Sequence, residues 1–242
     1  MTQPLLHILA YSSIPVAATA LGAAVAVLIP PGPKVRSAIQ HFAAGVVFSV
    51  VAVELLPDII RVHDVREVVL GFGLGIALML AIRHFTAASE TKPDEPDTRR
   101  AGSVGMLVAI GIDFFLDGLL VGIGFAAGQK EGVLLTIALS IELLSLGLAI
   151  AAAYSATRRR AAILVPTSLA LMLVAGAVVG GLALQHLSDH ALAAVLSFGS
   201  AALLFLVTEE LLVEAHEVPE TQAATAMFFA GFLAFLVLGM VG

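Results

Sequence analysis

Eight long apolar stretches divide the 242-residue chain, and no other feature restricts its fold as strongly. An apolar run of about 18 residues or more is long enough to cross a bilayer as a helix. Lipid offers no hydrogen-bond partner to the backbone, so a spanning chain forms helices or a closed barrel. The alternating segments typical of a barrel do not occur here. An all-α protein is therefore expected, with spans at about 5–30, 37–60, 67–87, 102–127, 132–154, 161–184, 190–212 and 222–241.

The composition agrees with a polytopic membrane protein. Hydrophobic residues make up 60% of the chain and charged residues 12%, whereas about 25% of residues are charged in soluble domains. The chain has no cysteine, which excludes disulfides, thiolate metal sites and a cysteine nucleophile. One transmembrane domain over 1–242 is expected. Its first span should be an uncleaved helix, since no basic residue precedes it.

The basic residues predict the orientation of the spans. Nine lie beside the loops between spans 1 and 2, 3 and 4, and 5 and 6, and only three lie on the opposite side. The nine are Lys34, Arg36, Arg83, Lys92, Arg99, Arg100, Arg158, Arg159 and Arg160, and the three are Arg61, Arg66 and Lys130. Because basic residues favour the cytoplasmic side, both termini are expected outside, with the charged loop 87–103 in the cytoplasm. The expected location is the cytoplasmic (inner) membrane.

Two segments of similar sequence indicate an internal repeat. FAAGVVFSVVAVELLPD (42–58) aligns without a gap with FGSAALLFLVTEELLVE (198–214), and Glu54 matches Glu210. The two segments would run in opposite directions through the membrane, which is typical of the inverted repeats of secondary transporters. The predicted repeats are spans 1–3 and 6–8, with spans 4 and 5 between them. Chance similarity between two Leu- and Val-rich helices is the alternative.

Three acidic residues fall near the middle of spans 4 and 5. Asp113 and Asp117 are four residues apart and share one helix face, and Glu142 lies halfway along the next span. An aspartate at the centre of a spanning helix is unfavourable by about 2.5–3.5 kcal/mol. No Lys or Arg lies in the middle of any span, so these acids need protons or a metal ion. The open alternative is a protonated acid bonded to a nearby carbonyl group.

Other acids and a histidine are weaker candidates for the same pathway. Glu54, Glu209 and Glu210 lie closer to span ends, where solvated charge explains them equally well. The loop LLVEAHEVPETQ (211–222) adds His216 and Glu217 and has no basic residue. His41 is expected to be an interfacial histidine. We expect the others to line the path by which a cation enters or leaves: Glu54, Glu209, Glu210, His216 and Glu217.

The motifs of spans 4 and 5 resemble those of the ZIP (Zrt/Irt-like) divalent-metal transporters. DFFLDGLLVG (113–122) is similar to the family's H-N-x-P-E-G signature, with Asp113 at the His position and Asp117 at the Glu position. ELLSLGLA (142–149) is similar to H-E-x-P-E-G-L-A, with Glu142 at the His position and Ser145 at the Pro position. The resemblance implies eight spans, outside termini and a homodimer. It further implies a metal site on spans 1, 4, 5 and 6, and a scaffold made of the others.

The departures from the family pattern restrict the expected ligands. No histidine or proline remains in either motif, which leaves Asp113, Asp117 and Glu142, with Ser145 as a further oxygen donor. Oxygen ligands suit Mn²⁺, Mg²⁺ or Ca²⁺ best, while Fe²⁺, Zn²⁺ and Cd²⁺ remain candidates. The metal would be the transported substrate, and no organic cofactor or nucleic-acid partner is expected. The partners implied are the lipid bilayer and a second copy of the chain.

The sequence thus favours a secondary transporter that carries a divalent cation into the cell. The alternative is a protein of ZIP fold that has lost metal transport and acts as a sensor, a partner subunit or a proton-linked carrier. An intramembrane enzyme is not expected. Two aspartates on one helix cannot present both carboxyl groups to one scissile bond, and no H-E-x-x-H pattern is present.

Overall fold

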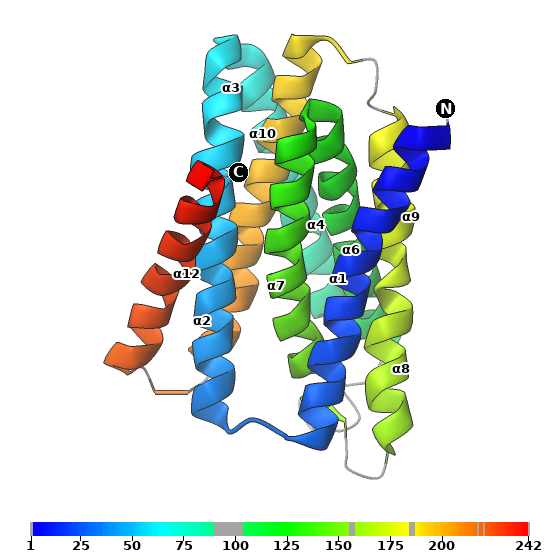
Figure 1. Ribbon diagram of the computed structural model, residues 1–242, viewed down its shortest axis with the longest axis vertical. Coiled ribbons are helices and arrows are strands. Elements are labelled where there is room, and N and C mark those ends of the chain that lie inside the picture. The colour runs from blue at the N-terminus through cyan, green and yellow to red at the C-terminus, as the bar shows by residue number, and fades with distance from the viewer. Residues whose placement is uncertain are drawn as a thin grey trace.

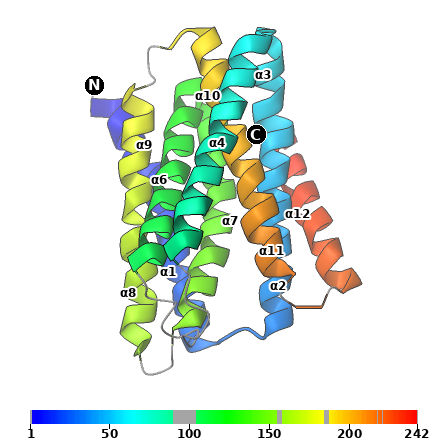
Figure 2. The same ribbon diagram turned by 180° about the vertical axis from the view of Figure 1, so that it is seen from behind.

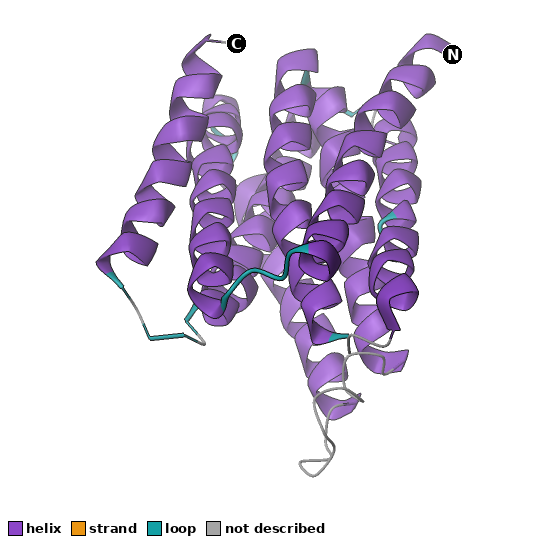
Figure 3. Ribbon diagram, turned by 60° about the horizontal axis from the view of Figure 1, so that its bottom comes forward, coloured by secondary structure: helices purple, strands orange, loops and turns teal. Residues whose placement is uncertain are grey.

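The computed structural model describes residues 2–89, 104–154, 158–183, 187–216, 218–219 and 221–241. Eight helical spans in this part of the chain are long and apolar enough to cross a membrane, so the expectation of eight spans is confirmed. The described residues form helices and loops without any strand (Figure 3). Most of the loop expected at 87–103 lies outside the described residues, and so does Glu217.

Five of the spans are single helices. They are α1 (Thr2–Leu28), α4 (Val65–Ser89), α6 (Val104–Ala127), α7 (Gln129–Ala153) and α12 (Gln222–Val241). α1 continues through Pro15 without a break. These helices have apolar residues around most of their circumference, as expected for segments that contact both neighbouring helices and lipid.

The other three spans are composite. Their parts are α2 (Pro33–Val50), η1 (Val51–Leu55) and α3 (Leu56–Val62); α8 (Arg159–Leu169) and α9 (Leu171–Ala183); and α10 (Asp189–Leu206), η3 (Val207–Leu211) and α11 (Leu212–Ala215). η1 and η3 are π-helical, and each carries acidic residues. Span 6, expected as one helix, is interrupted at Ala170. Pro166 lies inside α8, four residues before the interruption, and the main-chain N–H of Ala170 still donates a hydrogen bond of 2.9 Å to its carbonyl oxygen.

The helices run along the long axis of a bundle, with both termini in the upper half of Figure 1. α1 meets α2 and α11 meets α12 at the end drawn at the bottom of Figure 1, which we call the lower end. Four helix pairs account for most of the close packing: α1 with α7, α6 with α9, α2 with α12, and α4 with α10. Figure 2 shows the last of these pairs from behind.

Burial differs strongly among the helices. α7 is the most buried span, whereas α4 and α12 are among the least buried. Leu70 and Leu74 of α4 are 60% and 64% exposed, and Phe229 of α12 is 64% exposed. Such large apolar side chains at a surface are expected where the surrounding medium is lipid. The protein is therefore a multi-pass membrane protein in which α7 lies at the centre of the bundle.

Candidate metal site

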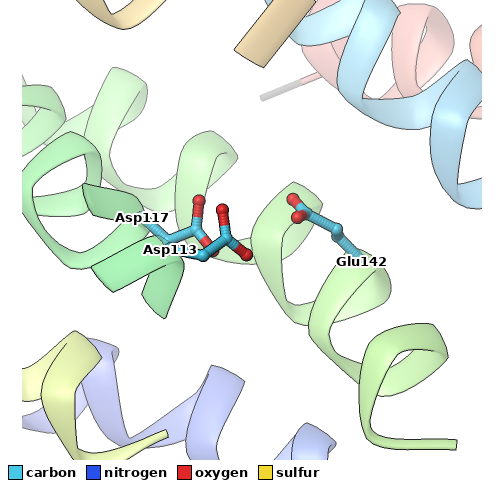
Figure 4. Close-up of side chains that lie close together, drawn as sticks. All are labelled: Asp113, Asp117 and Glu142. Atoms are coloured by element: carbon cyan, nitrogen blue, oxygen red, sulfur yellow. The ribbon is translucent and has the colours of Figure 1, made fainter. Parts of the chain in front are cut away.

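Asp113, Asp117 and Glu142 converge between α6 and α7, near the middle of both helices. One carboxylate oxygen from each residue lies within 4.8 Å of the other two. Figure 4 shows the two aspartates side by side on α6 and Glu142 opposite them on α7. The spacing of four residues places the aspartates on one face of α6, and the packing of α6 against α7 brings Glu142 to that face. We call these three residues the carboxylate cluster.

The carboxylate cluster is deeply buried and incompletely bonded. Asp117 is 2% exposed and Glu142 is 1% exposed, while Asp113 is partly buried. Asp117 Oδ2 and Glu142 Oε2 have no hydrogen-bond partner among the described residues. In the same part of the chain, no ion pair reaches any of the three carboxyl groups. Buried polar atoms are nearly always satisfied, so these two oxygens indicate a proton or a cation as partner.

Two cavities adjoin the carboxylate cluster. The α4–α6 cavity has a volume of about 220 Å³, and its polar lining consists of Arg83, Asp113, Glu209 and Glu210. The α7–α11 cavity has a volume of about 250 Å³ and includes Glu142 and Glu214 in its lining. Both cavities share Leu146, Glu209 and Glu210. Acidic side chains therefore continue from the carboxylate cluster along η3 and α11 toward the lower end of the bundle.

Glu209 and Glu210 lie inside span 7 rather than at its end. The sequence predicted a span that ends near residue 212, but the helix continues to Ala215. Ala215 is fully buried, and its carbonyl oxygen accepts a hydrogen bond of 2.7 Å from Ser37 Oγ of α2. This contact with α2 stabilises the additional turn. A π-helical segment contains one extra residue per turn and often marks a functional site.

Glu54 is not brought to the carboxylate cluster. It lies in η1, and its Oε1 is packed against α12, where a Cβ atom added to Gly239 would lie 2.7 Å from it. Lys130 Nζ donates a hydrogen bond of 3.0 Å to the carbonyl oxygen of the same Gly239. Glu54 thus lies beside a lysine, toward the end of the bundle opposite the lower end.

Ser145 is buried one turn along α7 from Glu142. Its Oγ donates a hydrogen bond of 2.8 Å to the main-chain oxygen of Glu142, and the residue is 1% exposed. The hydroxyl group is thus occupied as a donor, although its oxygen still has acceptor capacity. Ser145 lines neither of the two cavities.

At the lower end, α2 and α11 bring together polar residues that lie far apart in the sequence. Gln40 Nε2 donates a hydrogen bond to Glu214 Oε2, and the rings of His41 and His216 contact each other with centroids 5.2 Å apart. His41 Nδ1 is 2.8 Å from the carbonyl oxygen of Ser37. His41 was expected at the membrane interface, but it is only 3% exposed. His41 is buried because span 7 extends one turn further than expected. The residue types in that turn do not predict the extension.

At the opposite end, Asp64 connects α4 and α10. Its Oδ2 lies 2.8 Å from His190 Nδ1, and its Oδ1 accepts a hydrogen bond of 3.4 Å from the main-chain N–H of Glu67. The N–H of Glu67, followed by His190, holds the pKa of Asp64 below its usual value. This exposed contact between Asp64 and His190 connects spans 3 and 7 and is remote from the carboxylate cluster in sequence and in the fold.

Comparison of the chain with models of known protein families and with curated proteins gives no match. The fold and the site together define a class: a multi-pass helical membrane protein with three converging carboxyl groups inside the bundle.

Proposed function

We propose that the protein is a secondary transporter of the ZIP type that moves a divalent metal cation across the cytoplasmic membrane into the cell. The observation that carries the proposal is the carboxylate cluster, in which three oxygens lie within 4.8 Å of one another. A divalent cation bound between three carboxylates would satisfy the unpartnered oxygens of Asp117 and Glu142. Ionisable groups inside a membrane protein commonly mark the pathway of an ion or proton.

The ligand set favours a hard or borderline cation. All three candidate ligands are carboxylates, and no histidine is part of the cluster. Such oxygen donors suit Mn²⁺, with Fe²⁺, Zn²⁺ and Cd²⁺ as further candidates. Water and the Ser145 hydroxyl would complete the coordination shell, because three carboxylate oxygens do not fill it.

An inverted repeat of spans 1–3 and 6–8 is part of the proposal, and the π-helical segments support it. η1 (Val51–Leu55) and η3 (Val207–Leu211) occupy equivalent positions in the two aligned segments. Glu54 and Glu210 are equivalent within them. Short π-helical segments are rare, so two at matched positions are hard to attribute to chance similarity of two apolar helices.

Helix contacts give independent support for the repeat. A Cβ atom added to Gly231 of α12 would lie 2.1 Å from the carbonyl oxygen of Phe42 in α2. At the equivalent positions, a Cβ atom added to Gly75 of α4 would lie 2.6 Å from the carbonyl oxygen of Phe198 in α10. The α2–α12 and α4–α10 pairs therefore pack in the same register.

A related correspondence, with an offset of 154 residues (from 22 to 176) in place of 156 (from 42 to 198), extends to the helices that carry the carboxylate cluster. A Cβ atom added to Gly22 of α1 would lie 2.0 Å from the carbonyl oxygen of Leu144 in α7. A Cβ atom added to Gly176 of α9 would lie 2.0 Å from that of Phe115 in α6. These contacts support an equivalence of α6 and α7 in which Asp113 corresponds to Glu142. Substrate sites of inverted-repeat transporters lie at the repeat interface near mid-membrane, where these two residues meet.

The cavities give the proposed direction of release. The lower end faces the cytoplasm in the orientation that the basic residues favour. A cation leaving the carboxylate cluster would pass Glu210, which lines both cavities, and then Glu214. His216 and Glu217 follow in sequence and would receive it at the membrane surface.

Uptake of radioactive Mn²⁺ into proteoliposomes tests the proposal. Wild-type protein should accumulate the ion, whereas Asp113→Asn, Asp117→Asn and Glu142→Gln should each reduce uptake to near background. Glu67→Gln removes an acid that lines neither cavity and serves as the matched control. Uptake of Mn²⁺, Fe²⁺, Zn²⁺ and Cd²⁺ that survives all three cluster substitutions would refute the site.

The second candidate is a protein of ZIP fold that no longer transports metal. The absence of imidazole from the carboxylate cluster favours it, because protonated carboxyl groups could then stabilise the bundle or relay protons. Thermal unfolding of purified protein tests metal binding: a melting temperature that none of the divalent ions raises supports this second candidate, whereas stabilisation by an ion without uptake into proteoliposomes indicates a sensor.

A further inference from the structure

Arg83 lies beside the proposed path of a released cation. It is located near the lower end of α4, and its guanidinium group forms an ion pair with Glu209 of η3. It also lines the α4–α6 cavity, together with Asp113 and Glu210. Among the described residues that line the two cavities beside the carboxylate cluster, Arg83 is the single basic one.

Arg83 lies at the boundary between the α4–α6 cavity and the surroundings of the bundle. Its side chain is 59% exposed, and that of Glu209 is 36% exposed. An arginine remains charged at any physiological pH, and its long stem allows the head group to move. The guanidinium group is therefore a permanent cation, attached to the wall of the cavity, that can reach the acids of η3 or leave them.

We propose that Arg83 is a tethered counter-ion that competes with the transported cation for the acids of η3. It neutralises Glu209 when no cation is present and returns to Glu209 as the cation departs. This inference rests on the proposed transport function and deepens it, because it names the residue that promotes release on the lower side. Glu209 is the direct partner, and Glu210 is the next acid within the same cavity.

The need for such a residue follows from the distribution of charge. Within the described part of the chain, no basic residue forms an ion pair with the three cluster carboxylates. Three more acids, Glu209, Glu210 and Glu214, line the proposed exit path. A divalent cation among so many acids in a low-dielectric cavity would be held strongly. Transport requires binding that is weak enough for the ion to leave. A tethered positive charge beside the exit weakens binding of the ion there and shortens its residence.

A purely structural role for the ion pair makes a different prediction. Exposed ion pairs contribute little to stability, so neutral variants at Arg83 should fold. A structural ion pair would change the melting temperature by the same amount with and without metal and leave the affinity for the cation unchanged. A counter-ion changes the affinity itself.

The test compares wild-type protein, Arg83→Gln, Arg83→Lys and the control Arg160→Gln. Arg160 is an exposed arginine of α8, at the same end of the bundle, and it lines neither cavity. Mn²⁺ binding is measured by calorimetric titration at one pH and ionic strength, and Mn²⁺ uptake is measured in proteoliposomes. Arg83→Gln should bind Mn²⁺ on the order of tenfold more tightly and release it more slowly, so that both KM and maximal uptake fall. Arg83→Lys should lie between wild type and Arg83→Gln.

The outcomes separate this inference from the function on which it rests. Wild-type protein that neither binds nor transports Mn²⁺, Fe²⁺, Zn²⁺ or Cd²⁺ overturns the proposed function and the role of Arg83 with it. Wild-type protein that binds the ion, with Arg83→Gln binding it equally or more weakly, overturns the role of Arg83 alone. Tighter binding in Arg160→Gln as well would show a general surface-charge effect and would also overturn it. Arg83→Met, which keeps most of the stem, replaces Arg83→Gln if the glutamine variant does not fold.

Discussion

The carboxyl groups of Asp117 and Glu142 meet across the interface between α6 and α7, and each keeps one buried oxygen without a partner among the described residues. Two carboxylates at this distance repel each other strongly in a medium of low dielectric constant. The pair is stable only if a proton or a cation is shared between its oxygens. Either a proton or a metal ion can reduce this repulsion, so the protonation state of the site and its metal occupancy depend on each other.

Asp117→Asn and Glu142→Gln are expected to reduce the affinity for metal without destabilising the bundle. Amides have nearly the same shape as carboxyl groups and need no proton or cation, so the metal-free variants should melt at or above the wild-type temperature. An excess of Mn²⁺ of about 100 Kd should raise the wild-type melting temperature by about 5–10 °C. The measurement is thermal unfolding of the purified proteins with and without Mn²⁺. A full metal-dependent shift that persists in both variants would contradict the prediction.

The sequence predicts the main features of this site because they depend on short-range regularities. A spacing of four residues places Asp113 and Asp117 on one helix face, and a short connection brings the next helix, with Glu142, alongside. The number of spans follows in the same way from the length of the apolar stretches, and the structure confirms it. These inferences require no knowledge of how distant helices pack.

What the sequence does not reveal depends on contacts between distant segments. VAVEL and VTEEL have no composition that distinguishes a π-helical segment from an α-helix, so η1 and η3 were not expected. Arg83 was expected only to orient the chain, yet the packing of α4 against α10 places it in a cavity with Asp113. The partner of a long side chain is determined only when the helices have assembled. Arg83 and Glu209 are 126 residues apart, so their pairing cannot be predicted from local sequence.

Metal binding is expected to weaken as the pH falls. Protons and the cation compete for the carboxylates of Asp113, Asp117 and Glu142, so cation binding releases the protons that these groups hold when they are metal-free. At higher pH the cation has fewer protons to displace, so metal binding becomes stronger. At lower pH it becomes weaker. Calorimetric titration with Mn²⁺ in buffers of different ionisation enthalpy measures the number of protons released. Binding that is independent of pH between about 5 and 8, without proton release, would contradict this prediction.

The close helix contacts predict which glycines tolerate a methyl group. Gly176→Ala places a Cβ atom 2.0 Å from the carbonyl oxygen of Phe115 in α6, so α6 and α9 must move apart. Overpacking of this kind destabilises a protein by about 1–3 kcal/mol. Gly73→Ala is the matched control on α4, because no atom lies within 4 Å of its added Cβ, and alanine favours a helix over glycine by about 1 kcal/mol.

Thermal unfolding of these two variants in the same detergent is the measurement. We expect Gly73→Ala to melt at or above the wild-type temperature and Gly176→Ala to melt several degrees below it. Gly22→Ala, the position equivalent to Gly176 in the proposed repeat, should behave like Gly176→Ala, since its added Cβ would lie 2.0 Å from the carbonyl oxygen of Leu144. Equal melting temperatures for Gly73→Ala and Gly176→Ala would show that α6 and α9 do not pack as closely as described.

The orientation of the bundle can be tested directly, because the chain contains no cysteine. A single cysteine introduced by Lys130→Cys lies at the end opposite the lower end, and one introduced by Lys34→Cys lies at the lower end, beside the start of α2. If the lower end faces the cytoplasm, a membrane-impermeant maleimide should label Lys130→Cys in intact cells and Lys34→Cys only after permeabilisation. The control is labelling of both variants in detergent, which shows that each thiol is accessible. Labelling of Lys34→Cys, but not of Lys130→Cys, in intact cells would reverse the orientation and make the exit described here an entrance from outside the cell.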